Sequence, residues 1–373
     1  MTTSSAPDAS GHDQDWTSTT ELASIAKWLA TKNNVLCLTH VKPDGDAVGS
    51  TLAVARALNI AGGGTADGFG GVATRAHVVY AAPIPHWLYA VAGETSFSVI
   101  EPGQSPPTTM PNGNAPDAIV VLDTGSWNQL APFESLLKAN TPKVAAIDHH
   151  LRGDPDVTNR RVVDASWASA TMPAGELCRH LLGLESMSQL PPEVAKPCYL
   201  GLATDTGWFR HANVSPSALR FAAELLETGI DHAPLLELTE QRERSSRLKL
   251  LKRALESLQY HDGERIATIA LTIKDYEKSG SSRGESGGFL DIIKTVETVR
   301  AAALLTEADP SEDGTPLTKI SLRSKPGAGF IDVNRVAAQF GGGGHAMAAG
   351  ARISATISEA RAQLVEVLVE GGG

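Results

Sequence analysis

Four short apolar segments of this chain each run directly into acidic or imidazole side chains. They are residues 35–38, 118–122, 144–147 and 199–203. Apolar runs of this length are typical of buried strands in a parallel sheet. Because the carboxyl ends of parallel strands line one crevice, polar residues that follow different strands can converge there. The pattern predicts an α/β fold with a parallel sheet and one polar site at its edge.

The residues that follow these segments supply six candidate metal ligands. They are His40, Asp44, Asp46, Asp123, His149 and Asp205. Pro43 and Gly45 favour a turn in which the two carboxylates of the first cluster point the same way. A helix is expected to begin at Gly49 and Ser50, with amides that could meet a phosphate. Oxygen ligands mixed with imidazole favour manganese or magnesium over structural zinc.

Each cluster taken alone has an ordinary structural explanation. Asp-Gly and Asp-Thr-Gly sequences are common in turns and helix caps, and a pair of histidines is often a surface feature. Four such clusters in one chain are hard to produce by turn chemistry alone, so the joint pattern favours a metal site.

The same segments give the chain a resemblance to a known family. It resembles the Asp-His-His (DHH) phosphoesterases, and within them the two-domain nanoRNase and pAp phosphatase (NrnA-like) branch. The matching motifs are residues 40–50, 121–125, 147–150, 204–210, 321–324 and 340–350. The resemblance runs from about residue 20 to the C-terminus. It implies a two-lobed α/β protein, in which a parallel-sheet DHH domain is joined by a helical linker to a smaller α/β domain.

The resemblance also implies two divalent metal ions, with Mn²⁺ preferred and Mg²⁺ as the alternative. The residues implied for one ion are His40, Asp44 and Asp123, and those for the other are Asp46, Asp123, His149 and Asp205. Asp123 would bridge the two ions. Asp148 would orient His149, and His150 would contact the scissile phosphate or assist the leaving group.

A run of four glycines before His345 has two explanations. Such a run usually forms a flexible linker. Here it follows an expected helix and precedes an expected strand, so its backbone could approach an anionic ligand. Arg323, at the end of another expected strand, has the planar fork suited to a phosphate. The residues expected to bind a substrate phosphate are Arg323, Gly342, Gly343, Gly344 and His345.

The length of 373 residues suggests two domains, with a boundary near residue 240. The expected parts are a disordered tail at 1–18, the DHH domain at 19–215, a helical connector at 216–258 and the substrate-binding domain at 259–373. In the last part, strands are expected at 266–272, 299–305, 317–322 and 348–351, and helices at 332–340 and 357–368. Glycine- and proline-rich loops are expected at 62–64, 68–71 and 102–116, with no chemistry assigned to them.

Composition limits the class of partner and the compartment. A net charge of -10 gives no overall basic field for tracking long duplexes, so a nucleic-acid substrate should be short and held locally. The three cysteines are an odd number without Cys-x-x-Cys spacing, which favours reduced thiols and a cytoplasmic protein. No apolar run is long enough to cross a membrane. A homodimer is compatible with the resemblance.

The function implied by the resemblance is hydrolysis of very short oligoribonucleotides to mononucleotides, with removal of the 3′-phosphate of adenosine 3′,5′-bisphosphate (pAp). Both substrates would present one phosphate to the metal ions and another to Arg323 and His345. A phosphatase restricted to pAp and a hydrolase of linear dinucleotides such as pGpG are alternatives. A nucleotide-binding regulator without catalysis is disfavoured because none of the candidate ligands is missing. A pyrophosphatase is disfavoured because the glycine-rich segment stands where those proteins have a basic motif.

Residues 208–211 lie just beyond the fourth cluster, and the evidence for a functional role is weaker for them. Trp208 and Phe209 could stack on a base, but core packing is the more common fate of such a pair. A surface salt bridge explains Arg210 as well as substrate contact does. His211 is left outside the candidate site.

Overall fold

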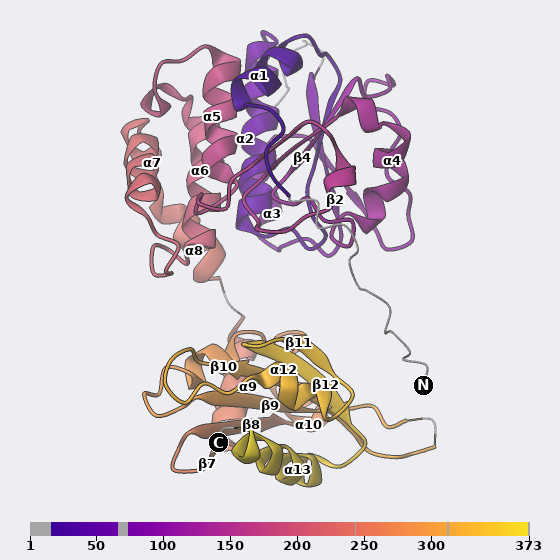
Figure 1. Cartoon of the computed structure of the whole chain (residues 1–373), viewed down its shortest axis with the longest axis vertical. Coiled ribbons are helices and arrows are strands. Elements are labelled where there is room, and N and C mark those ends of the chain that lie inside the picture. The colour runs from indigo at the N-terminus through magenta and orange to yellow at the C-terminus, as the bar shows by residue number, and fades with distance from the viewer. Residues whose placement is uncertain (1–15, 66–73, 243, 312, 372–373) are drawn as a thin grey trace, which may run out of the picture. The chain divides into compact units, whose positions relative to one another are not determined.

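The computed structural model describes residues 16–65, 74–242, 244–311 and 313–371. The chain divides into two compact units, with the division between Gln241 and Arg242 (Figure 1). Residues 1–15 of the expected tail and the loop expected at 68–71 lie outside the described residues. Residues 62–64 and 102–116 contain neither helix nor strand, as expected for loops.

The first unit is built on a parallel sheet of six strands in the order β3-β2-β1-β4-β5-β6. The strands are β1 (Val35–Leu38), β2 (Ala76–Ala81), β3 (Phe97–Ile100), β4 (Ala118–Leu122), β5 (Val144–Asp148) and β6 (Arg161–Val163). The helices are α1 (Leu22–Ala30), α2 (Gly45–Ala61), α3 (Leu88–Ala92), α4 (Glu134–Ala139), α5 (Thr171–Leu182), α6 (Pro192–Asp205), α7 (Pro216–Glu227) and α8 (Ala233–Glu240). The predicted α/β class is confirmed.

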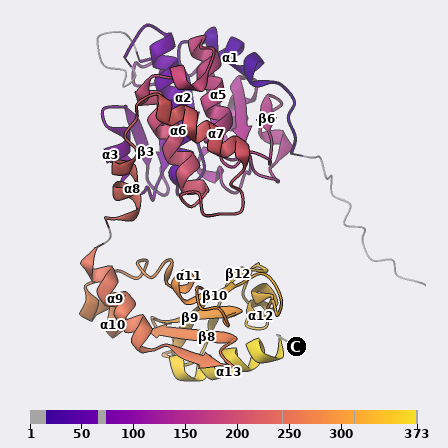
Figure 2. The same cartoon turned by 90° about the vertical axis from the view of Figure 1, so that its left-hand side faces the viewer.

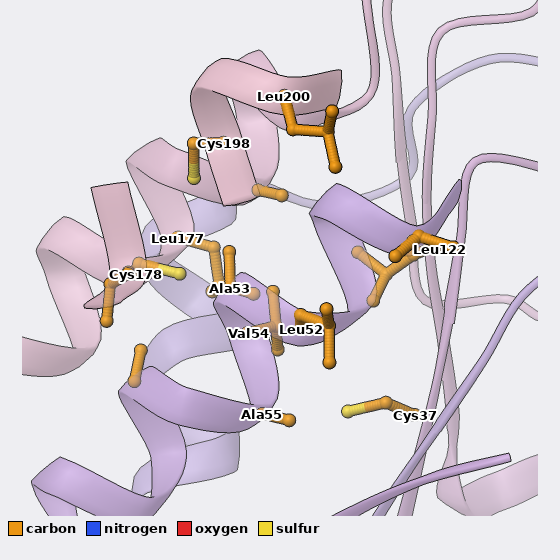
Figure 3. Packing of buried hydrophobic residues seen from close by; sticks show 14 of the residues in the cluster. Cys37, Leu52, Ala53, Val54, Ala55, Leu122, Leu177, Cys178, Cys198 and Leu200 are labelled. Atoms are coloured by element: carbon orange, nitrogen blue, oxygen red, sulfur yellow. The ribbon is translucent and has the colours of Figure 1, made fainter. Parts of the chain in front are cut away.

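Both faces of this sheet are buried, which explains the continuous apolar runs of its strands. Alternate residues such as Cys37 and Leu122 belong to a large core with α1, α2, α5 and α6 (Figures 2 and 3). Their neighbours, such as Leu36 and Val121, belong to a second core that includes Leu137 of α4. The three cysteines are free and buried, as expected for reduced core thiols. None of the helices in the described ranges is both long and apolar enough to cross a membrane.

Glycines let α2 pack closely against α6 and α5. A Cβ atom on Gly45 would lie 2.2 Å from the Thr204 hydroxyl oxygen, and one on Gly49 would lie 2.4 Å from the Pro197 carbonyl oxygen. A Cβ atom on Gly201 would lie 2.2 Å from the methyl group of Thr171. The start of α2 therefore lies beside the end of α6.

Three expectations about the first unit are wrong. Residues 199–203 belong to helix α6 rather than to a strand, since Pro192 suits a first helical turn and the helix is buried on most sides. Helix α2 begins at Gly45 rather than at Gly49, because Asp44 caps it by accepting hydrogen bonds from the amides of its first turn. The disordered tail does not extend to residue 18, because Trp16 is buried.

The second unit contains a six-stranded sheet in the order β11-β12-β10-β9-β8-β7. All its neighbouring strands are antiparallel except β8 and β9. The strands are β7 (Gln259–His261), β8 (Ile266–Leu271), β9 (Ala301–Ala308), β10 (Leu317–Ser324), β11 (Gly343–His345) and β12 (Ala348–Ile353). The helices are α9 (Ser245–Glu256), α10 (Ile273–Ser279), α11 (Phe289–Ile293), α12 (Val333–Ala338) and α13 (Ile357–Glu370). Of the helices expected in one connector, α7 and α8 belong to the first unit and α9 to the second.

Candidate metal centre

The six predicted ligands come together at the carboxyl edge of the first sheet. His40 follows β1, Asp123 follows β4 and His149 follows β5, as the sequence pattern predicted. The other three are placed by helices: Asp44 is the N-cap of α2, Asp46 lies in its first turn, and Asp205 is the last residue of α6.

Asp123 is the centre of this cluster. One of its carboxylate oxygens, Oδ2, lies 3.4 Å from Nε2 of His40, and the other, Oδ1, lies 3.4 Å from Nε2 of His149. Asp44 lies 3.8 Å from the same nitrogen of His40. Asp46 and Asp205 lie 3.6 and 3.8 Å from the same nitrogen of His149. The side chains thus form two groups that share one carboxylate.

The candidate ligand atoms are close enough to hold ions. Within each of the groups His40/Asp44/Asp123, Asp46/His149/Asp205 and Asp123/His149/His150, one atom per residue lies within 4.8 Å of the others. Asp123 is buried, and its Oδ1 has no hydrogen-bond partner among the described residues. A buried carboxylate oxygen that accepts no hydrogen bond is costly, so a cation bound there would be stabilising. The mixed oxygen and imidazole donors fit divalent ions such as Mn²⁺.

The backbone holds two residues of this region in a sparsely populated conformation. Asp123 has a φ of 63° and Lys42 a φ of 55°, both in the left-handed region that non-glycine residues seldom adopt. Asp123 is fixed there by its amide, which donates to the Ile147 carbonyl oxygen at 3.0 Å. Such strain is often found where a side chain has to be aimed at a ligand.

Asp46 is fixed by the start of α5. Its two carboxylate oxygens accept hydrogen bonds from the backbone amides of Ala170, at 2.5 Å, and Thr171, at 3.0 Å. The side chain is 1% exposed. The orientation of this candidate ligand is therefore fixed by the backbone and does not depend on a bound ion.

The surrounding carboxylates raise the pKa values of both imidazoles. Burial alone would lower the pKa of His40, but the nearby carboxylates of Asp123 and Asp44 outweigh it and raise that pKa to about 11. Burial also acts to lower the pKa of His149, and the acidic neighbours raise it to about 10. At neutral pH the metal-free imidazoles therefore carry protons, which a metal ion has to displace.

Two carboxyl groups have raised pKa values because they are buried and lie close to other carboxylates. Burial raises the pKa of Asp46 well above its usual range, and the charges of Asp123 and Asp205 raise it further. Burial raises the pKa of Asp205 to about 6, against an opposing effect of the charge on His149. A divalent cation would relieve this repulsion.

Asp148 orients His150 rather than His149, which corrects the expectation from the resemblance. Its Oδ1 accepts hydrogen bonds from the amide of His149 at 2.8 Å, and from the amide and Nδ1 of His150 at 3.2 and 2.7 Å. The ring of His149 instead approaches the Trp167 carbonyl oxygen at 3.3 Å. The hydrogen bond with Asp148 raises the pKa of His150.

One residue in contact with this cluster was missed. The indole Nε1 of Trp16 donates to the other oxygen of Asp148, Oδ2, at 2.9 Å. The only sequence signal was a large aromatic residue at the end of a tail rich in Ser, Thr and Asp.

In the second unit, Arg323 and His345 form part of one cross-strand row. Arg323 of β10 pairs with Ala348 of β12, and His345 of β11 pairs with the same alanine from the other side. Directly paired residues point to the same face of a sheet, so both side chains lie on one face with only a methyl group between them. Arg323 is half-buried and His345 is exposed. We call Arg323, Ala348 and His345 the cationic row.

The glycines before His345 allow β11 to approach β12. A Cβ atom on Gly342 would lie 2.2 Å from the Gly350 carbonyl oxygen, and one on Gly344 would lie 2.4 Å from the Ala348 carbonyl oxygen. Gly343 is exposed, and a Cβ atom there would meet only the side-chain oxygen of Asn334, at 3.8 Å. The segment is thus a strand at the sheet edge rather than a linker.

The residues beyond Asp205 have structural contacts. Trp208 and Phe209 are partly buried against the main core of the first unit. Arg210 donates from Nε to the Gly207 carbonyl oxygen at 2.7 Å. Nδ1 of His211 lies 3.4 Å from the backbone oxygen of Asp205.

The fold and cluster place the chain in a known class. Residues 34–202 match the DHH family, N-terminal domain, and residues 265–370 match the DHHA1 domain. With these matches and a relative above 30% identity, the chain belongs to the DHH family.

Two similar proteins are bifunctional oligoribonuclease and PAP phosphatase NrnA enzymes. The protein from Thermus thermophilus is 31% identical over 326 residues, which cover 87% of this chain and 85% of that protein. The protein from Bacillus subtilis is 26% identical over 239 residues, covering 63% and 69%. The crystal structure of an exopolyphosphatase-related protein from Bacteroides fragilis has the same fold, with a TM-score of 0.72, 24% identity and coverage of 94% and 96%.

Proposed function

We propose that this protein is a metal-dependent phosphoesterase that hydrolyses short oligoribonucleotides to mononucleotides and dephosphorylates pAp. The observation that carries the proposal is the convergence of acidic and imidazole side chains around Asp123, whose buried Oδ1 has no hydrogen-bond partner among the described residues. The similarity to NrnA enzymes over most of the chain supports the substrate class.

The proposed centre holds two divalent ions, with Mn²⁺ preferred over Mg²⁺. The proposed ligands are His40, Asp44 and Asp123 for one ion, and Asp46, Asp123, His149 and Asp205 for the other. When bound, such ions supply positive charge that binds phosphoryl oxygens and lowers the pKa of an attacking water. Asp123 is the proposed shared ligand because its two oxygens face different imidazoles.

His150 is the proposed proton-transfer residue. Asp148 accepts a hydrogen bond from its Nδ1, so Nε2 remains available to exchange a proton with the leaving oxygen. The side chain of His150 is 53% exposed, and a substrate can therefore reach it. Asp148 is fully buried, so its proposed role is to position His150 rather than to contact the substrate.

The cationic row is the proposed site for a second phosphate of the same substrate. Arg323 offers a planar fork of N–H donors, and His345 adds a ring N–H. The glycines 342–344 carry no side chains that would keep a phosphate from the strand edge. This two-phosphate requirement suits both pAp and a 5′-phosphorylated dinucleotide, and it gives no advantage to long polymers.

The proposal also includes the location of the protein, its oligomeric state and the substrates that it excludes. A cytoplasmic location is supported by three buried free thiols. A homodimer and the exclusion of long duplexes stay predictions. A phosphatase restricted to pAp and a pGpG hydrolase differ from the proposal in substrate only.

A substrate panel tests the proposal. The purified protein is incubated with Mn²⁺ or Mg²⁺ and with end-labelled RNAs from dinucleotides to about twenty nucleotides, alongside pAp, pGpG and cyclic dinucleotides. We expect fast hydrolysis of the shortest RNAs and of pAp, with a steep fall in kcat/KM as length increases. Equal rates on the longest RNAs, or hydrolysis of pAp or pGpG alone, would contradict it.

A further inference from the structure

The segment before α1 is packed along the free edge of the first sheet. We call residues 16–20 the N-terminal strap. The amides of Thr19 and Thr20 donate to the Arg161 carbonyl oxygen of β6, at 2.9 and 3.3 Å. The hydroxyl of Ser18 donates to the Val163 carbonyl oxygen at 2.9 Å and accepts from the Val163 amide at 2.8 Å. Because β6 is the last strand of the sheet, these contacts fix the strap to its edge.

At the start of the strap, the indole ring of Trp16 occupies a place that two glycines leave open. A Cβ atom on Gly125 would lie 1.8 Å from the ring, and one on Gly153 would lie 2.5 Å from it. The guanidinium of Arg161 lies 5.3 Å from the ring centroid, and its Nε donates to the Thr17 carbonyl oxygen at 2.8 Å. Trp16 is 6% exposed, so its position is closely defined.

The ring places one hydrogen-bond donor, the indole N–H, at the candidate metal centre. Its Nε1 donates a hydrogen bond to Oδ2 of Asp148, while Oδ1 of the same carboxylate accepts one from Nδ1 of His150. Asp148 is 0% exposed, so bulk water does not reach its carboxylate while Trp16 is in place. With both oxygens engaged from different directions, the carboxylate cannot rotate about its Cβ–Cγ bond without losing a hydrogen bond.

We propose that Trp16 is a positioning residue for the phosphoesterase reaction. Its indole N–H fixes the carboxylate of Asp148, and that carboxylate fixes the ring of His150 with Nε2 free for the substrate. The proposal rests on the proposed function and adds to it a residue from outside the family motifs. It makes the strap part of the active site rather than a tail.

The first test replaces the indole by a ring that cannot donate. Trp16→Phe should lower kcat by about tenfold and leave KM within twofold, as expected for loss of a contact behind a reacting group. Trp127→Phe is the matched control, because the Trp127 indole donates to an exposed carboxylate, Asp156, at 2.9 Å. The control should keep the kcat of the wild type. A fall in kcat no greater than in the control would overturn the proposal.

A double-mutant cycle separates positioning from simple destabilisation. In a His150→Ala background, Trp16→Phe should cause no further loss of kcat, because the residue it positions is gone. Gly153→Ala should reproduce the loss and the non-additivity, since its methyl group displaces the ring without changing the indole. An equal loss of kcat with and without His150 would show that Trp16 acts on the fold alone.

A third measurement is independent of activity. With ¹⁵N-labelled tryptophan in the metal-free protein, the Trp16 indole proton, assigned by its loss in Trp16→Phe, should exchange slowly with water. Asp148→Ala should speed its exchange at least about tenfold and leave that of Trp127 unchanged. Fast exchange in the wild type would overturn the proposal. If exchange shows the hydrogen bond between Trp16 and Asp148 but the protein hydrolyses no phosphoester, the proposed function is refuted and the hydrogen bond is confirmed.

Discussion

At the residue scale, the proposed metal centre depends most on Asp123. Asp123→Ala should lower kcat by at least about a hundredfold, because it removes the carboxylate shared by both groups of ligands. The protein should still fold, since the variant loses the ion pairs with His40 and His149 but no hydrogen bond of Oδ1. Steady-state kinetics with a nitrophenyl phosphodiester, together with circular dichroism, check this. A folded variant with near-normal turnover would refute the shared-ligand assignment.

Protonation of the imidazoles makes metal affinity depend on pH. Raised to about 11 and 10, the pKa values of His40 and His149 lie above the ordinary value of 6.5. Their ion pairs therefore stabilise the metal-free protein fully below about pH 6.5, and this stability is lost as pH rises toward 10. Since a metal ion displaces these protons, Mn²⁺ affinity should rise about tenfold per pH unit for each proton released.

Thermal unfolding of chelator-treated protein with and without Mn²⁺ measures this effect. The increase in Tm that Mn²⁺ produces should be larger at pH 8 than at pH 6. Asp205, with a pKa of about 6, contributes in the same direction at the acid end, because it too must be ionised to bind the ion. An increase in Tm that does not change with pH would contradict the assigned ligands.

The candidate ligands could be predicted because each directly follows an apolar run or a turn signal. The contacts of Asp148 could not. Whether it faces His149 or His150 depends on side-chain directions at a strand end, which neighbouring sequence does not define. The contact with Trp16 joins residues 132 positions apart. No local pattern encodes such a contact.

At the scale of elements, the packing of α2 against α5 and α6 positions three of the candidate ligands. Gly201→Ala should lower the free energy of unfolding by about 1 to 3 kcal/mol, because the new methyl group overlaps Thr171 and approaches Oδ1 of Asp46 at 2.8 Å. Mn²⁺ affinity should fall as well, since Asp46 must move. Denaturant unfolding and metal titration check both effects.

Gly284→Ala is the matched control for this packing, because a Cβ atom there would have no neighbour within 4 Å. It should leave both stability and Mn²⁺ affinity close to those of the wild type. Equal behaviour of the two variants would mean that the contact between α2 and its neighbours does not position the site.

A substitution in the cationic row should distinguish an effect on substrate binding from an effect on the reaction at the first unit. Arg323→Ala should weaken a charge-assisted phosphate contact by about 1.5 to 3 kcal/mol, roughly ten- to a hundredfold in kcat/KM for pAp and for 5′-phosphorylated dinucleotides. It should spare a nitrophenyl phosphodiester, which has no second phosphate. Arg283→Ala is the control, because Arg283 is paired with Asp309. An equal loss on the simple ester would assign Arg323 to catalysis or folding instead.

Most of the strands and helices that were expected from the sequence are present, and the exception has a physical reason. Strands β1, β4 and β5 were expected from their apolar runs and the turn residues after them. Residues 199–203 have a similar run, but here it is one part of a longer helix that is apolar because α2 and α5 cover it. Apolar runs buried on all sides lose the periodicity that distinguishes a helix from a strand.

At the scale of the whole molecule, each unit has its own sheet and its own cores. Two hydrophobic clusters lie on the faces of the first sheet and two on those of the second. The division after Gln241 lies beside the boundary expected near residue 240. Within this organisation, all candidate metal ligands belong to the first unit and the cationic row to the second.

In the proposed metal centre, the shared carboxylate of Asp123 organises two divalent ions for phosphoester hydrolysis. The most direct test is a titration of chelator-treated protein with Mn²⁺, in which bound metal per chain and turnover of pAp are measured in the same samples. We expect two bound ions per chain, with turnover appearing as the second ion binds. Full turnover with one ion or none per chain would contradict it.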